Sequence, residues 1–316
     1  MKSFEKPLPR AAAITAPLPE PLALMLRKGR LPHSLCVEGR NGTGRRSVAL
    51  QTAGAVLCER DDGQMCGECP HCRKVLLGVH PDLTLLDGNA DRDAFKLDNL
   101  RRALKAAWLE PNEAQAKVII LLEAQLLSHA AQNLLLKIME EPPENTFFIL
   151  VCSNRFSLLP TILSRVTVVA VPAPEPAACI AALQELAPGR SAEAYHRAAM
   201  LTGYSPGQSA KILCDEEENT LFESALSALQ ALAEDNPYRA LTAAVPFEKS
   251  RQLQTRFLNV VSEMLAVREL TEELGLSGET LFIMRENLAA LLSLAEGNAY
   301  LPLVSALFGE LREKRK

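Results

Sequence analysis

Short apolar segments alternate with amphipathic helical segments through the first half of the chain. Each apolar segment is brief and rich in Val, Ile, Leu or Phe, which predicts a buried strand. Five such strands are expected, at residues 35–38, 82–86, 118–122, 147–152 and 166–171. Strands that alternate with helices require crossover connections. The pattern therefore predicts an α/β fold with a parallel sheet covered by helices on both faces.

The helices expected between these strands show leucine and alanine at helical spacing. One stripe consists of Leu97, Leu100 and Leu104. A second stripe consists of Leu127, Ala131, Leu134, Leu135 and Ile138. The two prolines at 142 and 143 are expected to end the second helix, because proline cannot continue a helix.

The pattern changes after residue 171, where Pro172, Pro174 and Pro176 indicate a linker. Residues 173–213 are expected to form a small helical domain. Residues 214–316 are expected to form an all-helical C-terminal domain, with helices at 221–233, 251–269 and 280–295. The predicted domains are therefore 1–172, 173–213 and 214–316. The basic tail from Arg312 to Lys316 is expected to fray.

Charge and composition exclude several classes of protein. The net charge of −4 provides no global field that would attract the molecule to nucleic acid, and aromatic residues at 5% do not suggest a base-stacking platform. Glu5 and several early prolines interrupt any signal-peptide core, and no apolar run is long enough to span a membrane. We expect a cytoplasmic protein, in which cysteines bind metal more readily than they form disulfides.

The segment 39–46 follows the first predicted strand and opens a helix, where a phosphate-binding loop of the form G-x-x-x-x-G-K-[ST] belongs. The glycines that allow a tight turn are present, at Gly39, Gly42 and Gly44. Arg45 stands where the lysine belongs, and Arg46 replaces the hydroxyl that would hold magnesium. Because an arginine fork is larger than an ammonium group, Arg45 is not a simple substitute. We expect a degenerate, non-functional phosphate loop.

The third predicted strand carries a second defect. Residues 117–124 have the form of a Walker B strand, in which hydrophobic residues precede Asp-Glu, but Leu122 occupies the Asp position. A carboxylate on the magnesium side is therefore missing. Glu123 either orients a water molecule or is an ordinary carboxylate at the end of a strand. Two independent losses predict that the chain does not hydrolyse ATP.

Four cysteines form a C-x7-C-x2-C-x2-C cluster, at Cys58, Cys66, Cys69 and Cys72. Four thiolates suit tetrahedral Zn²⁺, and two-residue gaps are a common ligand spacing. His71 and His80 are alternatives to one of the cysteines, and unconnected free thiols are the other interpretation. Because a groove-reading helix and aromatic residues are missing, we expect a structural zinc module over 58–72. The other four cysteines are expected to be buried small residues: Cys36, Cys152, Cys179 and Cys214.

Several further segments form a recognisable set together with the cysteine insert. They are residues 29–34, His80-Pro81-Asp82, residues 131–143 and residues 159–165. Residues 131–143 are similar to A-x-N-A-L-L-K-x-L-E-E-P-P, and residues 159–165 to L-P-x-T-I-x-S-R-C, with Val166 in place of the last cysteine. Together these segments resemble the AAA+ subunits of bacterial clamp loaders, over about residues 29–210.

The resemblance implies an AAA+ base domain with a zinc insert, a helical lid and a C-terminal collar that holds an oligomer together. Gamma and tau subunits of this family are motors with intact ATP motifs. Delta-prime members often have a degraded phosphate loop and keep the zinc module and the Ser-Arg pair. The family's lid arginine falls at Gln208, which is a third departure from a motor subunit. The delta-prime type is therefore the expected one.

The family also implies partners and a mechanism. Motor subunits flanked by delta and delta-prime open the sliding clamp and place it on primed DNA, within the DNA polymerase III holoenzyme at the nucleoid. Arg165 would act as an arginine finger in the neighbouring motor's site. Alternatively, Arg165 is an ordinary surface or strand-capping arginine. Lys137, Arg101 and Lys105 either line a DNA-facing interior or form a solvated basic face.

Two other functions compete with this interpretation. The first is a gamma/tau-like motor ATPase with unorthodox motifs, which nucleotide turnover by the isolated chain would reveal. The second is a free-standing zinc-containing nucleic-acid binder. Co-purification with motor and delta subunits separates that class from a clamp-loader subunit.

Overall fold

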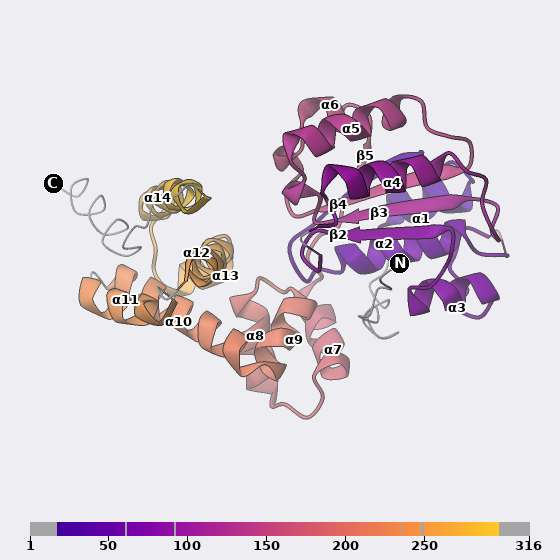
Figure 1. Ribbon diagram of the computed structural model, residues 1–316. Coiled ribbons are helices and arrows are strands. Elements are labelled where there is room, and N and C mark those ends of the chain that lie inside the picture. The colour runs from indigo at the N-terminus through magenta and orange to yellow at the C-terminus, as the bar shows by residue number, and fades with distance from the viewer. Residues whose placement is uncertain (1–17, 61, 92, 235, 248–249, 297–316) are drawn as a thin grey trace. The chain divides into compact units, whose positions relative to one another are not determined.

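The computed structural model describes residues 18–60, 62–91, 93–234, 236–247 and 250–296 (Figure 1). The chain divides into two compact units, residues 1–173 and residues 174–316. Residues 1–17, where Glu5 and several prolines argue against a signal peptide, lie outside the described residues, and so does the basic tail from Arg312 to Lys316.

A five-stranded sheet forms the centre of the first unit, in the order β2-β3-β4-β1-β5, and all of its paired strands are parallel (Figure 1). The strands are β1 (Ser34–Glu38), β2 (Leu83–Asp87), β3 (Lys117–Leu122), β4 (Thr146–Cys152) and β5 (Thr167–Ala170). Each strand end lies within one residue of its predicted position. The predicted α/β class is therefore confirmed.

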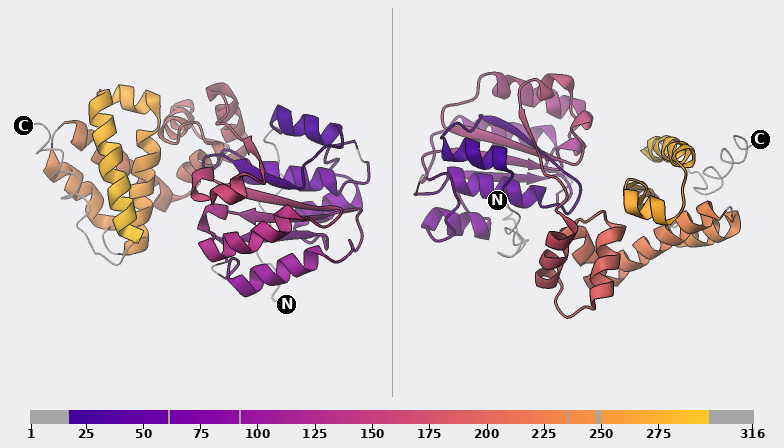
Figure 2. Two further views of the ribbon diagram at one scale, coloured as in Figure 1. Left: turned by 90° about the horizontal axis from the view of Figure 1, so that it is seen from above. Right: turned by 180° about the vertical axis from the view of Figure 1, so that it is seen from behind.

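Helices cover both faces of this sheet (Figures 1 and 2). On one face lie α1 (Glu20–Arg27) and α2 (Arg45–Val56), with α3 (Pro70–Leu77) beside α2. On the other face lie α4 (Leu97–Ala107), α5 (His129–Glu140) and the short α6 (Pro160–Leu163). Because successive strand residues point to opposite faces, Leu35 and Val37 join the first core and Cys36 joins the second.

Helix α5 begins later than the leucine spacing predicts. Leu127 lies before it, in extended backbone that follows the short 3-10 helix η2 (Ala124–Leu126). The Ser128 side chain accepts a hydrogen bond from the Ala131 N–H at 3.2 Å and caps the helix. Leu127 is nevertheless buried in the same core, which explains why it fits the apolar stripe. As predicted, the helix ends before the two prolines.

The described residues of the second unit form helices and no strand, which confirms the predicted helical C-terminal region. In chain order these helices are α7 (Pro176–Leu186), α8 (Ala192–Leu201), α9 (Pro206–Cys214), α10 (Glu216–Ala233), α11 (Pro237–Ala244), η4 (Val245–Phe247), α12 (Arg251–Leu265), α13 (Arg268–Glu273) and α14 (Gly278–Glu296). The prediction of a single helix over 251–269 is wrong. The chain turns at Ala266 and Val267, so that α12 and α13 are separate.

One core runs through most of the second unit. Ala198, Leu201 and Ile212, from α8 and α9, pack in the same cluster as Phe222 of α10 and Phe257 of α12. A smaller cluster around Cys179 and Leu183 joins α7 to α8. Side-chain packing therefore continues across residue 213, where the sequence suggests a boundary. The division of this unit into a lid and a collar stays a prediction.

The parallel strands bring their carboxyl ends to one edge of the sheet. In the strand register Glu38 is opposite Cys152, Leu122 is opposite Val151, and Asp87 is opposite Leu122. The loops that leave β1, β2, β3 and β4 therefore start close together. In open α/β sheets this edge is where ligands bind.

Candidate functional site

The predicted phosphate loop connects β1 to α2 at this edge. Gly42 and Gly44 have φ angles of 79° and 96°, which a side chain rarely adopts, so the tight turn depends on glycine at both positions. Gly44 precedes the first residue of α2, and no side chain caps that helix end. The loop thus keeps the backbone form of a phosphate site, although its two functional side chains are replaced.

Arg45 is buried within the loop, and the residue as a whole is only 4% exposed. Its guanidinium donates hydrogen bonds to the Gly39 carbonyl at 2.8 Å and to Asn41 Oδ1 at 2.7 Å. It also donates to both carboxylate oxygens of Glu123, at 2.7 and 2.6 Å. Arg45 therefore bridges the loop after β1 and the residue that follows β3.

Arg46 makes a second ion pair at the same edge. Its Nη1 lies 3.0 Å from Asp87 Oδ2, at the end of β2. The other oxygen of Asp87 accepts hydrogen bonds from the N–H groups of Asn89 and Ala90. The position that would offer a hydroxyl to magnesium instead carries a cation, and it neutralises a nearly buried carboxylate.

Glu123 is neither free to orient water nor an ordinary surface carboxylate. Besides Arg45, it accepts a hydrogen bond from Gln125 Nε2 at 2.7 Å. The Gln125 oxygen in turn accepts from the Ser153 N–H, after β4. Leu122, at the missing Asp position, is 1% exposed and packs in the core. The arrangement is a closed network of side chains with no carboxylate at the Walker B Asp position.

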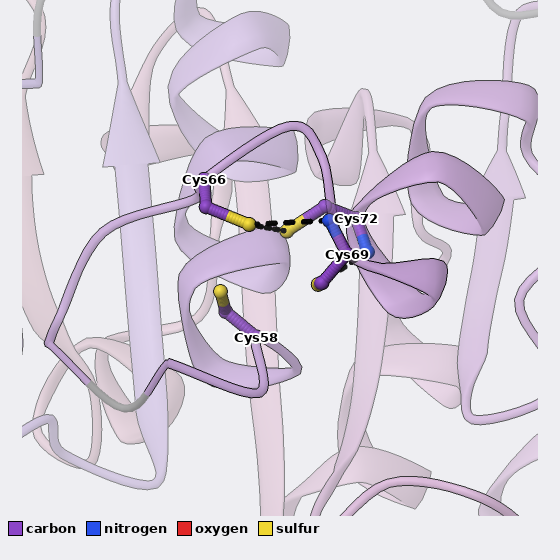
Figure 3. A group of neighbouring side chains, drawn as sticks. All are labelled: Cys58, Cys66, Cys69 and Cys72. Atoms are coloured by element: carbon purple, nitrogen blue, oxygen red, sulfur yellow. Dashed lines mark hydrogen bonds between the residues drawn. The ribbon is translucent and has the colours of Figure 1, made fainter.

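The second candidate site is the cysteine cluster beside α2 and α3 (Figure 3). The four sulfur atoms of Cys58, Cys66, Cys69 and Cys72 all lie within 4.8 Å of one another. Four sulfurs about 2.3 Å from one tetrahedral ion would lie about 3.8 Å apart. The Cys66 and Cys72 sulfurs are 3.8 Å apart. The spacing and the donor set therefore fit a metal ion.

Backbone N–H groups at the start of α3 donate hydrogen bonds to two of these sulfur atoms. The Cys69 N–H donates to Cys66 Sγ and the Cys72 N–H donates to Cys69 Sγ, each at 3.3 Å. Hydrogen bonds from the N–H groups of Cys69 and Glu68 lower the pKa of Cys66 to about 6. Burial raises the pKa of Cys58 and that of Cys72, so a nearby positive ion would favour the thiolate form of these two.

The two histidines near the cluster bind each other and are not part of the ligand group. His71 Nδ1 and His80 Nε2 are 2.8 Å apart, and His80 Nδ1 accepts from the Asp82 N–H at 3.0 Å. His71 Nε2 faces the Glu59 carboxylate at 3.6 Å. These contacts assign His80 as the donor to His71. Among the described residues, the metal-ligand group consists of the four cysteines, so the histidine alternative is not supported.

Asp82 gives the His-Pro-Asp segment a structural role. Its carboxylate accepts four hydrogen bonds, from the N–H groups of Asn112, Glu113 and Ala114 and from the Asn112 side chain, at 2.6–2.9 Å. Burial alone would raise the pKa of this carboxyl. The backbone donors outweigh burial and lower the pKa of Asp82 to about 2. The segment thus joins the start of β2 to the loop before β3.

Arg165 follows α6 at the surface of the first unit. Its guanidinium donates to the Thr161 carbonyl at 2.9 Å and to Ser164 Oγ at 3.1 Å, and it pairs with the Glu140 carboxylate. The side chain is 33% exposed. It is therefore held in place by weak surface contacts and can still be approached from solvent.

The remaining residues of interest lie on helices. Arg101, Lys105 and Lys137 are exposed on α4 and α5, which pack together, and Arg101 pairs with Asp98. Gln208 lies on α9 in the second unit. Among the four cysteines outside the cluster, three are buried as predicted. Cys214 is exposed, because it ends α9 two residues beyond the inward-facing Ile212 and so lies on a different face.

Comparison with known proteins decides the family. A family model described as DNA polymerase III, delta subunit, matches residues 16–175, which is half of the chain. This chain belongs to that family.

Similar proteins within and around the family support the same placement. The chain is 33% identical over 153 residues to the DNA polymerase III subunit delta' of Yersinia pestis, covering 48% of this chain and 45% of that protein. It is 33% identical over 175 residues to the same subunit of Pseudomonas aeruginosa, covering 55% and 53%. It is 35% identical over 145 residues to DNA polymerase III subunit tau of Escherichia coli, covering 46% and 22%. The chain spans about half the length of the delta' relatives that it matches.

These matches support a delta-prime-like clamp-loader subunit. The region shared with the family contains the phosphate loop, the cysteine cluster and Arg165. Sequence reasoning missed Asn41 and Gln125, which bond to Arg45 and Glu123, and Asp87, which pairs with Arg46. A signal for Asp87 was available, since it directly follows the strand predicted at 82–86 and the carboxyl ends of parallel strands meet at one edge of the sheet. In the part of the chain that the structure describes, no helix is long and apolar enough to cross a membrane.

Proposed function

We propose that this chain is the delta-prime subunit of a DNA polymerase III clamp loader. In this role it does not hydrolyse ATP, and it helps a motor complex to place the sliding clamp on primed DNA. The family match and the two delta' relatives support the assignment. The observation that carries the non-hydrolysing part is the largely buried pair between Arg45 of the phosphate loop and Glu123, which follows β3.

ATP hydrolysis depends on groups that are replaced in this chain. A phosphate-loop lysine contacts the β- and γ-phosphates, and a hydroxyl together with a Walker B aspartate holds magnesium. Arg45 points into the loop, Arg46 pairs with Asp87, and Leu122 is buried in the core. Without a magnesium site, Glu123 has no substrate-bound water to activate. We therefore expect no intrinsic ATPase activity.

Arg165 is the residue that we propose to act on another subunit. A surface arginine next to a short helix can enter the active site of a neighbouring molecule, where a guanidinium stabilises the charge on the transferring phosphoryl group. Its partial exposure and its solvent-facing pair with Glu140 are compatible with exchange of that partner for a phosphate. In this role Arg165 serves a gamma or tau motor subunit in trans.

We further propose that the cysteine cluster holds a structural Zn²⁺ ion. Four thiolates favour zinc over magnesium or calcium, which prefer oxygen ligands. All four coordination positions are filled by protein, so no position remains for a water molecule or a substrate. The cluster joins the end of α2 to the start of α3, and its role is to fix this insert on the first unit.

The partners follow from the same proposal. They are the gamma or tau motors and the delta subunit, and through the complex the sliding clamp and primed DNA. The second unit supplies a helical collar for this assembly. A clamp loader works on chromosomal DNA, so we place the protein in the cytoplasm with the replisome at the nucleoid. Lys137, Arg101 and Lys105 are candidates for contacts with the DNA backbone, because they are exposed.

Co-purification tests the proposal directly. The tagged chain, expressed at its natural level, should bring the motor and delta subunits with it at matched salt. Deleting helices α12 to α14, which belong to the proposed collar, should abolish this co-purification. A chain that is isolated without either subunit, yet binds nucleic acid by itself, would contradict the proposal and favour a free-standing zinc-containing binder.

The similarity to tau subunits supports one competing function, a motor ATPase with unusual motifs. Turnover of ATP by the isolated chain separates the two functions. The delta-prime proposal predicts no turnover above a buffer blank. Turnover that Glu123→Gln abolishes would show instead that this chain is a motor.

A further inference from the structure

The interior of the phosphate loop is filled by a side chain of the loop itself. A lysine at position 45 would extend toward a bound phosphate. The Arg45 guanidinium instead turns back and donates four hydrogen bonds to groups of the loop and of the adjacent strand end: Gly39 O, Asn41 Oδ1 and the two Glu123 oxygens. The side chain is 5% exposed, and its pairing partner Glu123 is 18% exposed.

The charges at this edge are balanced without a ligand. Arg45 neutralises Glu123, and Arg46 neutralises Asp87, whose side chain is 6% exposed. A nucleotide phosphate in the loop would have to displace the Arg45 guanidinium. Displacement would leave Glu123 without its cation next to a second anion, and breaking one side of a buried ion pair is strongly unfavourable. Nucleotide binding is therefore opposed by the folded loop itself.

We propose that Arg45 is a built-in occupant of the phosphate loop, which keeps the loop closed to nucleotides. This inference rests on the non-hydrolysing function proposed above and adds a cause to it. An inactive site could still bind ATP or ADP, whereas a filled site binds neither.

Calorimetric titration of ADP and of ATP into the full chain tests this inference. The wild-type chain should show no binding at millimolar nucleotide. The double variant Arg45→Lys with Arg46→Thr rebuilds the loop pattern and leaves Leu122 unchanged, so it should bind nucleotide at least about tenfold more tightly without hydrolysing it. Arg40→Lys is the matched control, because Arg40 is an exposed arginine of the same loop. This control should behave as the wild type does.

Chemical rescue keeps the inference testable if the double variant does not fold. Arg45→Ala removes the guanidinium and leaves a space of that shape beside Glu123. Low millimolar guanidinium chloride should raise the Tm of Arg45→Ala by a few degrees, although the same salt lowers or leaves unchanged the Tm of the wild type. Sodium chloride at equal ionic strength is the control for charge screening.

Three results would overturn the inference. One is nucleotide binding by the wild type as tight as that of the double variant. Another is a folded double variant that binds no nucleotide. The last is an Arg45→Ala variant that guanidinium does not stabilise. None of these results changes whether the chain co-purifies with motor and delta subunits, so a failure here is distinguishable from a failure of the proposed function.

Discussion

Replacing Asp82 by asparagine tests whether a single buried carboxylate fastens the start of β2 to the loop before β3. Asp82 is 2% exposed and accepts four hydrogen bonds. An asparagine amide offers one oxygen and one NH₂ group. In either orientation the NH₂ group faces N–H donors that previously met a carboxylate oxygen. Asp82→Asn therefore removes the charge and leaves buried donors without an acceptor.

The pKa of Asp82 sets the size of the effect. Its value falls from 3.8 to about 2 on folding, because the backbone donors outweigh burial. Each pKa unit corresponds to about 1.4 kcal/mol, so the charged form contributes about 2 kcal/mol to the free energy of unfolding at pH 7. Since the folded pKa lies below the unfolded one, this contribution is present above pH 3.8 and is lost as the pH falls through about 2. The unpaired donors should bring the total cost at pH 7 to about 2–4 kcal/mol.

Urea denaturation at pH 7 and pH 3 measures this difference between wild type and Asp82→Asn. At pH 3 the part that comes from the charge should fall to about half, because that pH lies between the two pKa values. Asp98→Asn is the control, since the Asp98 side chain is 89% exposed and should cost less than about 1 kcal/mol. The reasoning would be refuted if Asp82→Asn lost less unfolding free energy than the control did. It would also be refuted if the loss were the same at both pH values.

Three further predictions concern the metal cluster, the insert and the proposed finger. The purified chain should carry about one equivalent of zinc, and Cys69→Ser should lose the metal and unfold at lower urea; freely titratable thiols in the native chain would contradict this. Gly63→Ala should cost more stability than Gly67→Ala. Both residues have positive φ, but a Cβ at 63 would lie 2.6 Å from the α1 backbone whereas a Cβ at 67 meets open space. In reconstituted complexes Arg165→Ala should assemble normally but lower clamp-stimulated ATPase and clamp loading; wild-type loading by Arg165→Ala would remove the finger role.

Periodicity and local motifs were sufficient to predict the architecture of the first unit. Alternating apolar runs and helical stripes predicted the strands of the first unit, because a parallel sheet buried on both faces needs continuous apolar strands. The cysteine spacing predicted a cluster, since neighbouring turns can bring such closely spaced residues together. The same reasoning failed at two residues whose burial or secondary structure does not follow from the local pattern. Leu127 is buried without being helical, and Cys214 is exposed despite its apolar neighbours.

The chemistry at the sheet edge was decided by tertiary structure. The sequence shows that Arg45 replaces a lysine, but it does not show where the guanidinium points. Its partner Glu123 lies 78 positions away, and Asp82 and Asn112 are 30 positions apart. Such pairs meet only because the parallel register aligns strand ends that are distant in the chain. Local sequence therefore determined which groups are missing from the phosphate loop, and the packing of β1 and β3 with α2 determined what replaces them.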